Sequence, residues 1–208
     1  KNNIFKDLQM KIDSFDPDII FCSGLSSHIH GEGEYVNIQY GNELLKNIKT
    51  NAIKIGGGLQ PTAKPEILYE KFSNLDYFIG GESELILVEL ANKKLDIKNF
   101  EETKGLIKKN NGKTIVNFPQ EIISDMDKIS HYDYSVFEEQ VFYRAYNGEV
   151  IKAVDYELSR GCVYTCSYCV ETTIQNYYGF NETTKTGVLK NAPSYLRNKS
   201  AKRAYEEI

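Results

Sequence analysis

The sequence lacks several features that would place it in well-known classes of protein. Its 208 residues contain no apolar run long enough to cross a membrane, and no apolar signal segment opens the chain. The G-x-G-x-x-G and Walker patterns of nucleotide-binding loops are missing. The net charge of −4 argues against a dedicated nucleic-acid surface. We therefore expect a globular, cytoplasmic protein of one or two domains, with no nucleic-acid or membrane partner.

Cysteine is scarce, but three of the four cysteines lie within eight residues of one another. Cys162, Cys166 and Cys169 have the spacing C-x3-C-x2-C, with no fourth cysteine close behind. Three thiolates from one loop can bind three irons of a cubane cluster and leave the fourth iron open for a small molecule. An open coordination position is typical of catalytic rather than structural metal sites. The pattern therefore predicts a reactive iron–sulfur cluster.

Zinc and disulfides are the two less favoured interpretations of this loop. A structural zinc ion usually has four protein ligands, and here the fourth would be distant in sequence: Cys22, His28, His30 or His131. Cys22 ends an apolar run and is expected to be a buried small hydrophobe. A disulfide would leave one thiol over, and nothing else in the sequence indicates secretion.

Apolar residues in the first hundred positions alternate between strand-like and helical spacing. We expect strands at residues 19–22, 52–55 and 76–79, and helices at residues 4–15, 35–48, 65–72 and 85–90. This alternation predicts an α/β fold, a doubly wound parallel sheet with helices on both faces. Because ligands bind beyond the carboxyl ends of such strands, the glycine-bearing loops at 23–33, 56–62 and 80–84 are candidate binding loops.

The second half of the chain has two hairpin signals before the cysteine loop. Asn111-Gly112 and Asn147-Gly148 each separate strand-like segments and are typical hairpin turns. We expect residues 155–158 to form the first strand of a second domain, with the cysteine loop at its carboxyl end. Ser200 is a candidate cap for a helix over residues 201–208.

The cysteine loop resembles the signature of the radical S-adenosylmethionine (radical SAM) enzymes, because Ser159-Arg160-Gly161 precedes Cys162 and Tyr168 precedes Cys169. The resemblance implies that Cys162, Cys166 and Cys169 bind a [4Fe-4S] cluster. Its open iron would bind S-adenosyl-L-methionine, which is then cleaved to methionine and a 5′-deoxyadenosyl radical. Tyr168 would lie against the adenine; the alternative is that its ring only packs the loop.

The loops of the first half resemble the cobalamin (B12)-binding domain that precedes many radical SAM barrels. Ser23-Gly24-Leu25 matches the S-x-L motif of that domain, and Gly56-Gly57 matches its Gly-Gly motif. The resemblance implies that Ser23, Leu25, Gly56 and Gly57 line the pocket for the nucleotide tail of cobalamin. One departure is Gln60, at a position where the family often has histidine. Another is that the cobalt-ligating D-x-H-x-x-G motif is missing.

These resemblances imply a cobalamin-dependent radical SAM enzyme. The expected reaction is methyl transfer, or radical rearrangement or cyclisation, at an unactivated carbon of a small-molecule substrate. Flavodoxin or ferredoxin would be the external electron donor. One alternative is a radical SAM enzyme whose leading domain no longer binds cobalamin. The other is a non-catalytic iron–sulfur or zinc module that binds a partner.

Three segments are expected from this resemblance. Residues 1–104 would be a flavodoxin-like, B12-binding-type α/β domain that lacks its start, and residues 105–152 a hairpin and linker. Residues 153–208 would begin a radical SAM (β/α) partial TIM barrel, with residues 171–193 covering a cofactor. Because the chain has no initial methionine and ends inside a helical pattern, we expect a piece of a longer protein, inactive alone.

Overall fold

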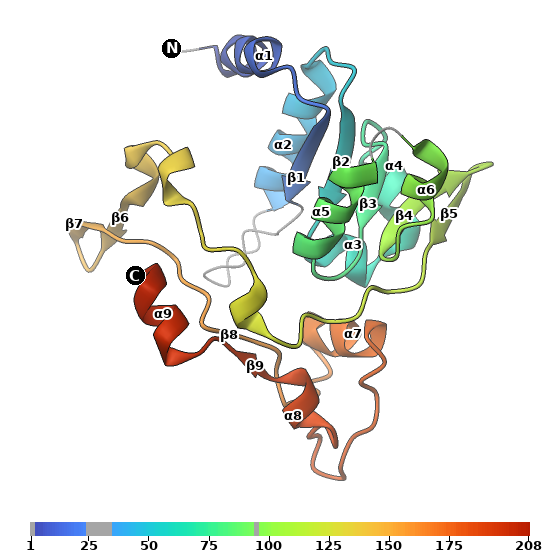
Figure 1. Cartoon of the computed structure of the whole chain (residues 1–208), viewed down its shortest axis with the longest axis vertical. Coiled ribbons are helices and arrows are strands. Elements are labelled where there is room, and N and C mark those ends of the chain that lie inside the picture. The colour runs from blue at the N-terminus through green and yellow to red at the C-terminus, as the bar shows by residue number, and fades with distance from the viewer. Residues whose placement is uncertain (1–2, 24–34, 94–95) are drawn as a thin grey trace. The chain divides into compact units, whose positions relative to one another are not determined.

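The computed structural model describes residues 3–23, 35–93 and 96–208 (Figure 1). The chain forms two compact units. The first contains residues 1–122 and 166–181, and the second contains residues 123–165 and 182–208. The cysteine loop therefore contributes to both units. The predicted domain boundaries at 104 and 152 stay predictions.

A five-stranded sheet forms the centre of the first unit. Its strands follow chain order: β1 (Ile19–Ser23), β2 (Ile53–Gly57), β3 (Tyr77–Ile79), β4 (Leu106–Asn110) and β5 (Lys113–Val116). The first three strands are parallel, as predicted, and the last two are antiparallel. The predicted hairpin is thus confirmed, and it extends this sheet through the pairing of β3 with β4.

Both predicted hairpin turns are confirmed by their backbone angles. Asn111 and Gly112 have φ values of 48° and 79°, and Asn147 and Gly148 have φ values of 49° and 80°. Two consecutive positive φ values are typical of the turn that suits the twist of a two-residue hairpin, and Asn-Gly tolerates them best. The second turn joins β6 (Tyr143–Tyr146) to β7 (Glu149–Lys152) in the second unit.

Helices accompany the strands of the first unit. They are α1 (Ile4–Phe15), α2 (Tyr35–Asn47), α3 (Leu59–Ala63), α4 (Leu68–Lys71), α5 (Glu84–Lys93), α6 (Ile97–Glu101) and α7 (Val170–Tyr177). Four of them, α1, α2, α4 and α5, lie at the predicted positions. The predicted helix at residues 65–72 begins as a 3-10 turn, Pro65–Ile67, and continues as α4. Helix α3 occupies what the sequence indicated as a loop. None of the described helices is long and apolar enough to span a membrane.

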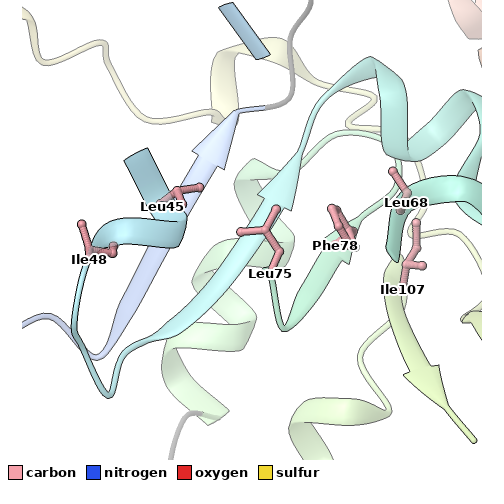
Figure 2. Close-up of a cluster of buried hydrophobic side chains, with 6 residues drawn as sticks. All are labelled: Leu45, Ile48, Leu68, Leu75, Phe78 and Ile107. Carbon is pink, nitrogen blue, oxygen red and sulfur yellow. The ribbon is translucent and has the colours of Figure 1, made fainter. Parts of the chain in front are cut away.

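Apolar side chains alternate between the two faces of the sheet. On one face Phe78 and Ile107 pack with residues of α2 and α4 and of the segments after α2 and before β3: Leu45, Ile48, Leu68 and Leu75 (Figure 2). On the other face the core contains residues of β2 to β4 and of α5 and α6: Ile55, Ile79, Leu106, Ile86, Leu90 and Phe100. Adjacent residues of a strand point to opposite faces, so one strand supplies both cores. The doubly wound arrangement is confirmed.

The second unit is built from short elements. They are the hairpin β6–β7, the strand pair β8 (Ser159–Arg160) and β9 (Arg197–Asn198), α8 (Ala192–Tyr195), α9 (Ala201–Glu207) and the 3-10 turns Met126–Lys128, Tyr134–Val136 and Glu139–Phe142. The predicted strand at residues 155–158 is wrong. The strand lies instead at Ser159 and Arg160, which pair antiparallel with Asn198 and Arg197 of β9. Just before this pair, the Leu158 carbonyl accepts a hydrogen bond from the Lys199 amide.

A buried cluster of charges anchors α9. The Lys199 Nζ atom lies 2.5 Å from Glu207 Oε2, and both side chains are 1% exposed. The same ammonium lies 4.1 Å and 4.6 Å from the ring centroids of Tyr132 and Tyr156. Arg203 pairs with the other Glu207 oxygen at 2.7 Å. A buried charge is stable only when it is paired in this way, so each member depends on the others.

The Glu207 carboxylate is held ionised by this cluster. Burial raises the pKa of Glu207, but hydrogen bonds from Lys199, Tyr156 and Arg203 outweigh burial and hold the pKa below its usual value. The stability that Glu207 contributes is therefore present above its unfolded pKa and is lost as the pH falls through its folded pKa. Ser200 caps α9 as predicted, since the Arg203 amide donates to Ser200 Oγ at 3.1 Å.

We predict that Glu207→Ala lowers the free energy of unfolding by roughly 3–5 kcal/mol, because it leaves the buried Lys199 ammonium without its partner. Urea denaturation followed by circular dichroism measures this change. Glu206→Ala is the matched control: its pair with Lys202 is solvent-exposed, at 3.8 Å, and should contribute less than about 1 kcal/mol. Equal losses for the two variants would contradict the role assigned to the buried cluster.

Candidate cluster loop and cofactor pocket

Cys166 and Cys169 are presented at the N-terminus of α7. Cys169 is the extended residue before the helix, with φ −98° and ψ 134°. Its amide donates to the Cys166 carbonyl at 3.1 Å, and Thr172 Oγ1 donates to the same carbonyl at 3.0 Å. This turn places Cys169 at the N-cap of α7, beside the positive end of the helix dipole, which favours an anionic group.

Cys162 lies in the second unit, directly after a glycine that the backbone requires. Gly161 has a φ of 92°, and a Cβ atom there would lie 2.4 Å from the Tyr195 carbonyl oxygen. The Tyr164 amide donates to Cys162 Sγ at 3.4 Å. The amide and the hydroxyl of Thr165 both donate to the Gly187 carbonyl, at 3.0 Å each. The start of the loop is therefore held by residues well beyond it in sequence.

Tyr168 lies beside two of the thiols and is open to solvent. Its side chain is 90% exposed. A hydrogen bond with Cys166 raises the pKa of the Tyr168 hydroxyl most, and electrostatic interaction with Cys166, local desolvation and electrostatic interaction with Cys169 raise it further. An exposed ring beside the cysteines is free to stack on a ligand, but contact with adenine stays a prediction.

The donor set of the loop fits an iron–sulfur cluster. None of the three cysteines forms a disulfide in the described part of the chain, all three have intermediate exposure, and thiolates are the usual ligands of such clusters. Across residues 3–23, 35–93 and 96–208, no three His, Cys, Asp or Glu side chains are gathered closely enough to bind a metal ion. The ligand roles of Cys162, Cys166 and Cys169 therefore rest on residue type and spacing.

The proposed fourth ligands of a zinc site have other surroundings. Cys22 lines an apolar pocket, and burial raises the pKa of its thiol. His131 Nδ1 lies 4.0 Å from Glu207 Oε1. His28 and His30 lie outside the described residues. Neither described candidate supports the zinc interpretation.

The residues predicted to bind cobalamin meet at the carboxyl ends of β1 and β2. The parallel register pairs Cys22 with Gly56 and Ser23 with Gly57. Ser23, Gly56 and Gly57 line a mostly apolar cavity of ≈ 230 Å³. The other lining residues come from β1, α2, α3, α4, β3 and the segments beside them: Cys22, Gly41, Asn42, Leu45, Gln60, Pro61, Leu68, Phe72, Leu75 and Phe78. Leu25 lies outside the described residues.

Gly56 and Gly57 also have a packing reason to be glycine. A Cβ atom on Gly56 would lie 2.7 Å from a ring carbon of Phe78, and one on Gly57 would lie 2.6 Å from the ring of Phe21. Both distances are too short for any side chain to be accommodated without movement. The two glycines thus bring aromatic rings against the sheet, and their contact with a cofactor stays a prediction.

The sequence indicated the loop at residues 56–62, which contains Gln60 and Pro61, as a binding loop, but not the contribution of α2 to this pocket. Gly41 and Asn42 lie in α2, and Gln60 and Pro61 lie in α3. Gly41 inside a helical segment was the available signal, because glycine is unfavourable there without a packing or functional reason.

No family model matches the chain. An uncharacterized methyltransferase of Pyrococcus horikoshii, PH0819, is 27% identical over 165 residues, which are 79% of this chain and 34% of the relative. An anaerobic magnesium-protoporphyrin IX monomethyl ester cyclase of Cereibacter sphaeroides is 25% identical over 166 residues, 78% of this chain and 26% of the relative. The chain thus spans about a third or less of the length of these curated relatives.

Two solved enzymes have similar structures. The radical SAM methyltransferase TsrM of Kitasatospora setae, solved with cobalamin and a [4Fe-4S] cluster, superposes with a TM-score of 0.60 at 20% identity. The match covers 99% of this chain and 37% of TsrM. The cobalamin-dependent radical SAM enzyme OxsB gives a TM-score of 0.58 at 17% identity, covering 98% of this chain and 24% of OxsB.

The chain has the fold of the matched parts of these two cobalamin-dependent radical SAM enzymes. The resemblance predicted from the sequence is therefore confirmed for the fold, including the flavodoxin-like, B12-binding type of the sheet.

We predict that replacing any one of Cys162, Cys166 or Cys169 by alanine removes most of the iron from the anaerobically reconstituted full-length protein. Each variant leaves two thiolates where the cluster needs three. Iron and sulfide content per chain measures the effect. Cys22→Ala is the control, because Cys22 lies in the wall of the apolar pocket. Full iron content in a loop variant, or equal loss in the control, would contradict the assignment.

Proposed function

We propose that this chain is part of a cobalamin-dependent radical SAM enzyme that acts on a small-molecule substrate. The proposal rests mainly on one observation: the candidate cobalamin-binding loops and two of the three cysteines lie in the same unit. The sheet that brings Ser23 opposite Gly57 lies in the same unit as the helix that begins after Cys169. The folds of TsrM and OxsB support the same assignment.

In this proposal Cys162, Cys166 and Cys169 hold a [4Fe-4S] cluster. Together with S-adenosyl-L-methionine, the cluster supplies one-electron cleavage of a sulfonium and hence hydrogen abstraction at an unactivated carbon. The chain's own residues hold and orient the reactants. Three thiolates leave one iron for the amino and carboxylate groups of S-adenosyl-L-methionine, and the exposed ring of Tyr168 orients the adenine.

Ser23, Leu25, Gly56 and Gly57 are proposed to hold the nucleotide tail of cobalamin. The described part of this set lines a cavity whose walls are mostly apolar, so a bound group there would be shielded from water. Relatives named as a methyltransferase and as a cyclase match the chain at similar identity. We propose methyl transfer, or radical rearrangement or cyclisation, with flavodoxin or ferredoxin as the electron donor.

A second candidate function is a radical SAM enzyme whose leading domain does not bind cobalamin. It is favoured by the packing of Gly56 against Phe78 and of Gly57 against Phe21, which explains both glycines without a ligand. In this case the first unit would position the substrate. Cobalamin titration separates the two functions.

The cluster is tested by anaerobic reconstitution of the full-length protein. We expect about four irons per chain and a changed electron paramagnetic resonance signal of the reduced cluster when S-adenosyl-L-methionine is added. One zinc ion per chain, with no response to S-adenosyl-L-methionine, would instead support a non-catalytic metal module. Cobalt content and visible spectra of the same sample report cobalamin independently.

The cobalamin pocket is tested by introducing larger side chains at Gly41, a residue of α2 that lines the pocket. A Cβ atom on Gly41 would have nothing within 4 Å, so Gly41→Ala should leave cobalamin affinity unchanged and add helix propensity. Gly41→Phe places a ring at the pocket wall, and we expect it to weaken cobalamin binding at least about tenfold by occupying the cavity. Spectral titration of the full-length variants measures both affinities. Unchanged binding by Gly41→Phe would place the cofactor elsewhere.

A further inference from the structure

Two adjacent tyrosines attach the end of α7 to the loop after β3. Tyr177 and Tyr178 lie with their ring centroids 5.1 Å apart and their planes at 82°. The Glu82 amide donates to the Tyr178 hydroxyl at 2.7 Å. Because Glu82 and Tyr178 are 96 positions apart in sequence, this bond is a specific tertiary contact rather than a local turn.

The glycines of this loop are required by the tyrosines. A Cβ atom on Gly80 would lie 2.7 Å from the Tyr177 hydroxyl oxygen, and one on Gly81 would lie 2.2 Å from the Tyr178 hydroxyl oxygen. Gly81 also has a φ of 81°, which favours glycine. The loop after β3, which the sequence indicated as a ligand loop, therefore packs against the C-terminal end of α7.

The same loop is bonded to the wall of the cofactor pocket. The Gly81 amide donates to Thr62 Oγ1 at 2.7 Å, and the Thr62 hydroxyl donates to the Gly58 carbonyl at 3.1 Å. Thr62 is buried in α3, next to the pocket residue Pro61. A continuous set of contacts thus runs from the pocket through α3 and the loop after β3 to α7.

We propose that Tyr178 is a positioning residue that couples the cobalamin pocket to α7, the helix that begins directly after the third cysteine. The inference rests on the proposed function, because it takes cobalamin as the pocket's ligand. A ligand against Pro61 and Gln60 restrains α3, and Thr62 passes this restraint to the loop that Tyr178 holds. The helix α7 then orders the backbone at its N-cap residue, Cys169.

Tyr177 provides a matched control for Tyr178. Its hydroxyl is buried, and it has no hydrogen-bond partner within the described part of the chain. Burial also raises the pKa of Tyr177 to about 12, so the hydroxyl stays neutral. Tyr177→Phe therefore removes a hydroxyl without breaking a hydrogen bond, whereas Tyr178→Phe removes the oxygen that accepts from the Glu82 amide and keeps the ring.

The test is hydrogen exchange of the α7 amides in the full-length protein, with and without hydroxocobalamin. In the cofactor-free protein, Tyr178→Phe should speed exchange in α7 about fivefold, the effect of losing one hydrogen bond, and Tyr177→Phe should not. In the wild type and in Tyr177→Phe, hydroxocobalamin should slow α7 exchange severalfold. In Tyr178→Phe this protection should be lost even when the cofactor is bound at saturation.

The outcomes separate the inference from the proposed function. If visible spectra show no binding of hydroxocobalamin, the cobalamin proposal fails, and the cofactor-free comparison of the two variants still decides whether Tyr178 holds α7. If hydroxocobalamin binds but α7 exchange does not change in the wild type, the coupling is wrong. Equal behaviour of Tyr178→Phe and Tyr177→Phe in both states would overturn the role of Tyr178.

Discussion

The parallel register of β1 against β2 is the constraint on which the candidate cofactor pocket depends. Hydrogen bonds along the two backbones place Ser23 opposite Gly57, and a shift by one residue would turn every side chain of β1 to the other face. The register is maintained by two apolar cores, one on each face of the sheet. Packing energy spread over both faces therefore decides which residues line the pocket.

The backbone of the cysteine loop is held in place by contacts both at its start and beyond its last cysteine. Gly161 must be glycine because the Tyr195 carbonyl lies where a side chain would be, and Thr165 is bonded to Gly187. Beyond Cys169, α7 is held through Tyr178 by the loop after β3. A short loop of this kind has too few internal contacts to be ordered alone, since each fixed residue costs backbone entropy.

Elements with strong local signals were predictable. The Asn-Gly turns, the apolar runs of the three parallel strands and the Ser200 cap all depend on residues adjacent in sequence. The failures share a different cause. The strand expected at residues 155–158 lies at Ser159–Arg160 because its position depends on the partner strand β9. Helix α3 was missed because its five residues include Pro61 and follow three glycines.

The sequence by itself determined the chemical types of the site: three thiols at C-x3-C-x2-C spacing, an aromatic residue before the third, and glycines after two strands. These follow from residue identity and short spacing, which no fold can alter. Only the tertiary structure decided that Gly80 and Gly81 accommodate Tyr177 and Tyr178, and that α2 lines the pocket. Such contacts join residues distant in sequence, and they exist only once the sheet has brought its loops together.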